Sequence, residues 1–92
     1  NEQIMDERKF IKKCKEIVRD YYNDIAKSTG KNGKITTEDV FVVWLCKTLQ
    51  HSKALVSTNV LDGMYYEVTY NGDKNECYVD AYKQLRNVCI EM

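Results

Sequence analysis

Side chains that could perform acid–base or metal chemistry are few in this sequence and widely spaced. His51 is the only histidine, so a catalytic triad or a histidine-based metal site has no partner at a known spacing. The four cysteines, at positions 14, 46, 77 and 89, include no CxxC pair and form no recognisable set of zinc ligands. The sequence therefore predicts no catalytic residue, no metal site and no cofactor, and we expect a protein that is not an enzyme.

Oxygen-rich side chains cluster once, between Asn71 and Glu76. Calcium prefers oxygen ligands, but this stretch lacks the EF-hand spacing and its terminal bidentate glutamate, so we interpret it as a hairpin turn. Neither GxGxxG nor GxxxxGK[ST] occurs in the chain. The sequence therefore contains no standard phosphate-binding loop.

Aromatic side chains are the best candidates for binding. The chain has seven tyrosines, and Tyr65 and Tyr66 are adjacent, so on a strand they would face opposite sides of the sheet. An exposed aromatic side chain can stack on a base or anchor a protein partner, although it can also be an ordinary sheet residue with a hydrated hydroxyl. Tryptophan is a frequent interface anchor, and core packing is the alternative for it. Our candidates for partner or ligand binding are Trp44, Lys47, Gln50, Tyr65, Tyr66, Tyr70 and Lys74.

The size and charge of the chain limit the classes of protein it can belong to. Its 92 residues fit a single domain covering 1–92, and 43% apolar with 30% charged residues is typical of a globular protein. Lysine and arginine total 14, as do aspartate and glutamate, so the net charge is zero. Because binding to nucleic acid is driven by an excess of cations, this balance argues against a nucleic-acid partner.

Cellular location is predicted from what the sequence contains. The N-terminus is charged and no apolar segment follows it, so we expect no signal peptide. No apolar run approaches the roughly 20 residues needed to span a bilayer. All four cysteines fall at apolar positions, which predicts buried free thiols and therefore a reducing, cytoplasmic compartment.

An amphipathic helix is predicted from about Asp6 to Thr29. Apolar residues recur there at i, i+3, i+4 and i+7, from Phe10 to Ile25, which is the spacing of one helix face. The acidic Asp6 favours the start, and Gly30 stands where a left-handed residue would end the helix.

A second helix is predicted over residues 37–52. Thr36 and Asp39 can form a capping box, and a polar stretch follows the apolar run 41–46. Taken alone, that run could also be a buried strand. A helix that is apolar on every side must be covered, by the rest of the fold or by a second subunit, so we expect a homodimer. An edge strand at this position would remove that argument.

The middle of the chain is predicted to be β-structure. Residues 54–58 form one candidate strand, and 64–70 alternate and are rich in β-forming residues. A two-residue loop at Asn71-Gly72 would place Glu67 opposite Glu76. We therefore prefer a four-residue loop over 71–74.

That longer loop would pair Val68 with Cys77 and Tyr66 with Val79. Residues 80–91 have helical spacing, which could extend backwards so that 74–79 is helix instead of a third strand. The predicted fold is thus α+β, with two N-terminal helices, a two- or three-stranded antiparallel β-meander and a C-terminal helix.

The C-terminal two thirds of the chain contains a specific series of short strings, namely 39–44, 46–50, 53–55, 57–58, 62–74 and 78–83. This series resembles a family of small uncharacterised proteins encoded by temperate phages of Gram-positive bacteria. The family carries no enzymatic assignment that could be transferred to this chain. It implies an early-expressed phage protein in the bacterial cytoplasm, and small phage proteins of that sort often bind a host or defence component, which is an analogy.

Together these points predict a non-enzymatic, homodimeric binding protein that engages or inhibits a host or mobile-element protein, including a defence-system protein. The alternative is a small-ligand protein that binds a signalling nucleotide, with tyrosines for stacking and Lys47, Lys53 or Lys74 for phosphate. A second alternative is a single-stranded nucleic-acid accessory protein, which the zero net charge disfavours.

Overall fold

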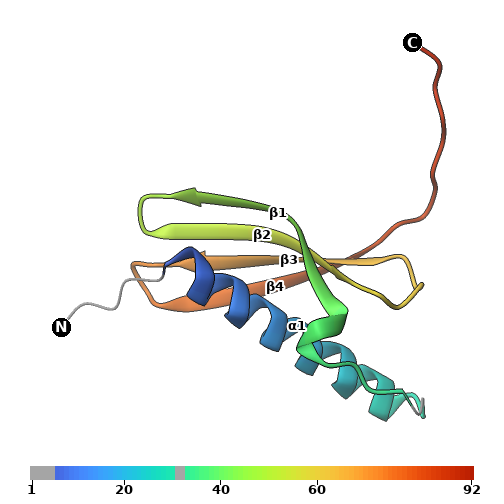
Figure 1. Ribbon diagram of the computed structural model, residues 1–92, viewed down its shortest axis with the longest axis horizontal. Helices are drawn as coiled ribbons and strands as arrows, with labels where there is room; N and C mark the ends of the chain where they lie inside the picture. Colours follow the sequence, from blue (N-terminus) through green and yellow to red (C-terminus); the bar gives the residue numbers. More distant parts are fainter. Residues whose placement is uncertain (1–5, 31–32) are drawn as a thin grey trace.

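One helix and a four-stranded antiparallel sheet make up the part of the protein that the structure describes. The computed structural model describes residues 6–30 and 33–92. Its elements, in chain order, are the helix α1 (Glu7–Ser28), a 3-10 turn η1 (Thr37–Asp39), and the strands β1 (Val40–Thr48), β2 (His51–Thr58), β3 (Met64–Asn71) and β4 (Glu76–Lys83). The strands are neighbours in the order β1-β2-β3-β4, and α1 crosses one face of the sheet (Figure 1).

The prediction for α1 is confirmed to within one residue at each end. The Asp6 carboxylate accepts a hydrogen bond from the backbone N–H of Lys9 at 2.7 Å, which satisfies one of the free donors at the helix start. Gly30 has a φ of +80°, the left-handed conformation that ends a helix.

The predicted second helix over 37–52 is wrong, although its start signal is real. Thr36 and Asp39 form the capping box, but the helix lasts only for η1 and the backbone at Val40 is already extended. The residues that follow are mostly β-branched or aromatic, which favours a strand, and they lack an apolar stripe of helical period. A tight turn, with Leu49 at a φ of 55°, then leads from β1 into β2.

The predicted C-terminal helix over 80–91 is also wrong. All eight residues of β4 pair with β3, and residues 84–92 have neither helix nor strand. Helical spacing is present in this stretch, but so is the alternation of Cys77, Val79 and Ala81 with Tyr78 and Asp80. The strand-like alternation decides the structure, because β3 offers a free edge whose backbone groups can pair with this segment. The meander therefore has four strands where we predicted two or three.

Strands β2 and β3 confirm the predicted segments 54–58 and 64–70, but the β3–β4 register differs by two residues. The connecting loop is residues 72–75, so Val68 lies opposite Val79 where we predicted Cys77. The Asn71 side chain accepts the backbone N–H of Asp73 at 3.0 Å, and Asn75 takes a φ of 53°. These two asparagines fix a turn one residue later than we predicted.

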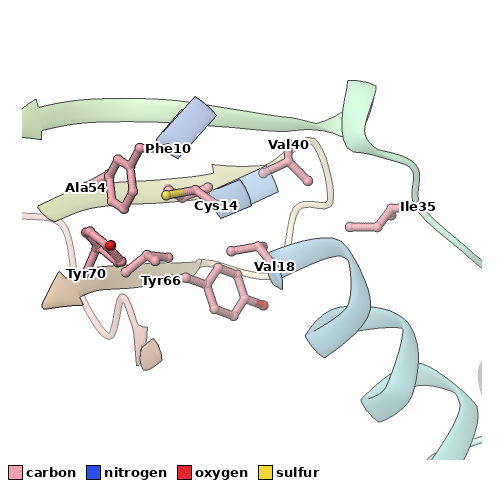
Figure 2. Close-up of a cluster of buried hydrophobic side chains, with 10 residues drawn as sticks. Phe10, Cys14, Val18, Ile35, Val40, Ala54, Tyr66 and Tyr70 are labelled. Atoms are coloured by element: carbon pink, nitrogen blue, oxygen red, sulfur yellow. The ribbon is translucent and has the colours of Figure 1, made fainter. Parts of the chain in front are cut away.

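The core lies between α1 and one face of the sheet (Figure 2). Phe10 packs on Tyr70 with ring centroids 6.5 Å apart, and Tyr21 meets Tyr66 edge to face at 5.6 Å. Fully buried or nearly buried side chains of this cluster are Phe10, Cys14, Val18, Ile35, Val40, Ala54, Val56, Tyr66, Val68 and Tyr70. The fold class is therefore α+β as predicted, whereas the number and order of its elements differ from the prediction.

Candidate partner-binding face

The sheet has a second face that no element of the described chain covers. Alternation along each strand sends half of the side chains toward α1 and the other half to the opposite side, which we call the open face. The large apolar and aromatic side chains of the open face are Phe41, Trp44, Leu55, Tyr65, Tyr78 and Tyr82.

These side chains are arranged by the strand register. Trp44 lies opposite Leu55 across β1 and β2, and Tyr65 lies opposite Tyr82 across β3 and β4. Trp44 is 43% exposed and Tyr82 is 53% exposed. Aromatic side chains that remain half exposed in the folded chain are available to a partner, and Trp and Tyr are the residues most enriched among binding hot spots.

A β-bulge directs Trp44 to the open face. In β1 the pairing moves from Val42–Val56 directly to Trp44–Leu55, so Val43 has no partner in the ladder. Without this extra residue, alternation would have placed Trp44 against the helix. The bulge therefore turns the largest side chain of the strand outward, a re-aiming that bulges commonly perform near functional sites.

Charge on the open face is mainly negative. Glu67 on β3 lies directly opposite Asp80 on β4, and the Lys53 ammonium approaches the Glu67 carboxylate at 3.6 Å. At the end of the sheet, the Tyr78 hydroxyl donates a hydrogen bond to Glu76, which raises the pKa of that hydroxyl. Three carboxylates thus accompany one ammonium among the open-face aromatic residues.

The structure brings together only some of the predicted candidate residues. Trp44 and Tyr65 share the open face. Tyr66 and Tyr70 point into the core and are 2% and 5% exposed, so they have no surface to offer a partner. Their burial follows from alternation, which also places Tyr65 on the other side of β3 from Tyr66.

The remaining candidates lie at the hairpin end of the sheet. Lys47 is near the end of β1, where it pairs with Ser52 on the helix side. Gln50 lies in the β1–β2 turn and Lys74 in the β3–β4 turn, and both are exposed. They do not converge with the open-face aromatic side chains.

The candidate residues predicted from the sequence leave out four members of the open face, which are Phe41, Leu55, Tyr78 and Tyr82. Phe41 was assigned to a helix, and residues from Asp80 onward were also assigned to one, so no sheet face could be assembled from them. Tyr78, Asp80 and Tyr82 are spaced by two residues, and this spacing could have indicated that they share one face of a strand. No pattern in the sequence marks the bulge that adds Trp44.

The all-apolar helix from which we expected a homodimer does not form. Residues 40–48 form an edge strand, not a helix that is apolar on all sides, so nothing there requires a second subunit for cover. An interaction hypothesis now has to stand on the open face, which is a separate observation.

The cysteines follow the burial prediction only in part. Cys14 is fully buried, and burial raises the pKa of its thiol to about 12. Cys77 is half-buried, whereas Cys46 and Cys89 are exposed. Within residues 6–30 and 33–92, no three His, Cys, Asp or Glu side chains are grouped as metal ligands, and α1 is not apolar enough to span a bilayer.

Comparison with known proteins gives one match. A family model, described as a family of unknown function, matches residues 11–92. That range includes most of α1 and the whole sheet. No curated protein and no solved structure matches the chain.

Proposed function

We propose that this chain, which belongs to the family of unknown function DUF6275, is a non-enzymatic binding protein whose open sheet face holds another protein. The observation that carries the proposal is the open face itself. It combines half-exposed Trp44, Tyr78 and Tyr82 with the partly exposed Leu55 in one continuous sheet. Hot spots of protein interfaces are enriched in tryptophan and tyrosine, and rigid strands hold such side chains at low entropic cost.

Charge supports a protein partner over a nucleic acid. Asp80 and Glu76 flank the aromatic side chains of the open face. On the described strands of this face there is one ammonium, that of Lys53, and it is paired with Glu67. A phosphate backbone or a nucleotide phosphate would be repelled by this surface. A protein surface with an apolar centre and lysine or arginine at its rim would be complementary in both respects.

The biological setting is part of the same proposal. The resemblance to small proteins of temperate phages of Gram-positive bacteria supports a partner from the host or from a rival mobile element, in the bacterial cytoplasm. The chain would then inhibit a host or defence protein by binding over a positively charged functional surface of that protein.

Photo-crosslinking in host cells tests the proposal directly. A benzophenone side chain at Tyr82 reports on the open face, and one at Ile25, which is 44% exposed on α1, is the matched control. We expect a cross-link to one other protein species from position 82 and none to that species from position 25. The partner is then purified, and its affinity for the unlabelled chain is measured by calorimetry.

Substitution separates specific binding from adhesion. Trp44→Ala and Tyr82→Ala should each weaken the purified complex at least about tenfold, as hot-spot truncations do. Leu61→Ala removes an exposed apolar side chain in the β2–β3 loop and should leave the affinity unchanged. Equal affinity of wild type and Trp44→Ala would refute an open-face interface.

The two alternatives are tested on the same preparations. A rise in melting temperature that grows with the concentration of a cyclic or linear nucleotide would favour a small-ligand protein. Salt-dependent binding to a single-stranded oligonucleotide would favour the accessory role. We expect neither.

A further inference from the structure

The chain after β4 forms an extended tail without any partner in the described structure. Gln84 still bonds through its N–H to the carbonyl of Gly63 at 2.7 Å, but residues 85–92 leave the body and run into solvent (Figure 1). Four large apolar side chains of this tail are exposed: Leu85 by 91%, Val88 by 57%, Ile90 by 75% and Met92 by 111%. Apolar side chains gathered in this way mark a segment that binds something.

The sequence of the tail is that of a half-buried strand. Val88, Ile90 and Met92 alternate with Asn87 and with residues 89 and 91, so one side of an extended chain would be apolar and the other largely polar. A strand of this kind becomes stable by adding to the edge of an existing sheet.

One edge of the sheet is suited to receive it. β1 and β4 are the two edge strands. β4 carries Glu76, Asp80 and Lys83, the kind of charges that protect an edge from pairing. β1 has nine residues with a single charged side chain, Lys47, and its Phe41 is 45% exposed. In terms of charged side chains, the outer edge of β1 is therefore the less protected of the two.

The tail cannot reach β1 of its own chain in a pairing arrangement. Lys83 ends β4 opposite Met64, on the far side of the sheet from β1. A strand outside β1 would lie four strand spacings from β4, which is about 19 Å. Because β4 is antiparallel to β1, a tail that returned over the sheet would run parallel to β1, and parallel pairing needs a crossover of about a dozen residues or more. Two residues, 84 and 85, separate the end of β4 from the alternating stretch 86–92, and this is too short for such a crossover.

We propose that residues 86–92 of one copy add as a fifth, antiparallel strand to the β1 edge of a second copy, reciprocally, to form a two-fold homodimer. Val88 and Ile90 then lie beside Phe41 and Trp44 on the open face, and each group shields part of the other's apolar surface from water. Reciprocal exchange closes the assembly at two chains instead of leaving an open series. This inference stands on the tail and the β1 edge, and it does not depend on the proposed function.

Oligomeric state is the first test, on the full chain by size-exclusion chromatography with light scattering. We expect wild type to have twice the mass of one chain at micromolar concentration. The double variant Val88→Asp/Ile90→Asp should have the mass of one chain and an unchanged circular dichroism spectrum, because both side chains are solvent-exposed. The control Asn87→Asp adds a charge on the polar side of the tail and should remain dimeric. A monomeric wild type, or a dimeric double variant, would overturn the proposal.

Native cysteines locate the tail on the partner. One variant keeps Cys89 with Cys46 and Cys77 changed to serine, and a second, affinity-tagged variant keeps Cys46 with the other two changed. The buried Cys14 stays in both. After mixing, a bismaleimide with a long flexible spacer, which can pass around the sheet edge, should join the two variants into a product of mixed mass. A third variant keeps only Cys77, on β4, besides Cys14. Cross-linking of Cys89 to that variant, and not to Cys46, would contradict pairing at β1.

Discussion

Glu67 and Asp80 face each other directly across β3 and β4, so that two carboxylates occupy adjacent positions in the middle of the open face. The register predicted from the sequence keeps Glu67 away from an acidic partner, whereas in the observed register Glu67 faces Asp80. Lys53, 3.6 Å from Glu67, offsets the repulsion in part. Like charges directly opposite one another destabilise a sheet, so this pair lowers the stability of the free protein.

Replacing Asp80→Lys should therefore stabilise the protein. The change turns a like-charge pair into an attractive one, and we expect the free energy of unfolding to rise by about 0.5–1 kcal/mol in urea denaturation at low salt. Asp80→Asn, which only removes the repulsion, should give a smaller gain. Both gains should shrink in about 1 M NaCl, where exposed charges are screened. A loss of stability in Asp80→Lys would show that the carboxylate makes a favourable contact. Under the proposed function, the same substitution should weaken the complex with a cationic partner.

The contact between the two hairpin ends depends on a glycine. Gly72 lies against the β1–β2 turn, where its N–H donates to Nδ1 of His51 at 3.3 Å. A Cβ added at Gly72 would overlap the carbonyl oxygen of Gln50 and lie 2.6 Å from its Cβ. Gly72→Ala should lower the free energy of unfolding by roughly 1–3 kcal/mol, because one of the two turns has to move. The matched control is Gly33→Ala, where a Cβ would meet nothing within 4 Å. Equal stability of the two variants would contradict the contact.

Stability should fall at alkaline pH because of two buried acids. Burial raises the pKa of the Cys14 thiol from 9.0 to about 12, and that of the Tyr66 hydroxyl from 10.0 to about 12. The folded state then holds protons that the unfolded state releases. The free energy of unfolding should be level below about pH 8 and should fall between about pH 9 and 12, by up to about 1.4 kcal/mol per pH unit for each group. Tyr66→Phe keeps the ring and removes one ionisation, so denaturation measured at several pH values should show a shallower fall for that variant.

The two faces of β3 should respond differently to truncation. Val68 is fully buried beneath α1 and lies opposite Val79, so Val68→Ala should cost roughly 2 kcal/mol of stability through lost burial and a cavity. The next residue, Thr69, points to the open face and is partly exposed. Thr69→Ala should cost less than about 1 kcal/mol. Chemical denaturation of both variants checks the assignment of the faces, and a reversed order of the two costs would contradict it.

Local signals predicted the parts of the fold that depend on local interactions. α1 has a capping aspartate, a regular apolar stripe and a terminal glycine, and all three act within a few residues of one another. β3 alternates over most of its length and is rich in β-forming residues, and its strand was predicted for those reasons. Thr36 and Asp39 show the limit of such signals, because their capping box forms but is followed by only one helical turn.

The secondary-structure predictions failed at segments whose conformation is decided by pairing with another strand of the chain. Residues 40–48 and 76–83 each fit a helix or a strand, and in both the choice is made by a neighbouring strand that supplies backbone hydrogen bonds. The open face could not be assembled from the sequence for the same reason, since its side chains come from all four strands. Trp44 adds a second obstacle, because its direction depends on one unpaired residue, Val43.

Strand order in this sheet equals chain order, and this has a consequence for how the molecule folds. Each ladder closes a loop of a few residues, which costs little conformational entropy, so every hairpin can nucleate without waiting for another. Among the described elements, α1 is the one whose docking must bring distant parts of the chain together. The slow step of folding should therefore be the docking of α1 onto a meander that has already formed.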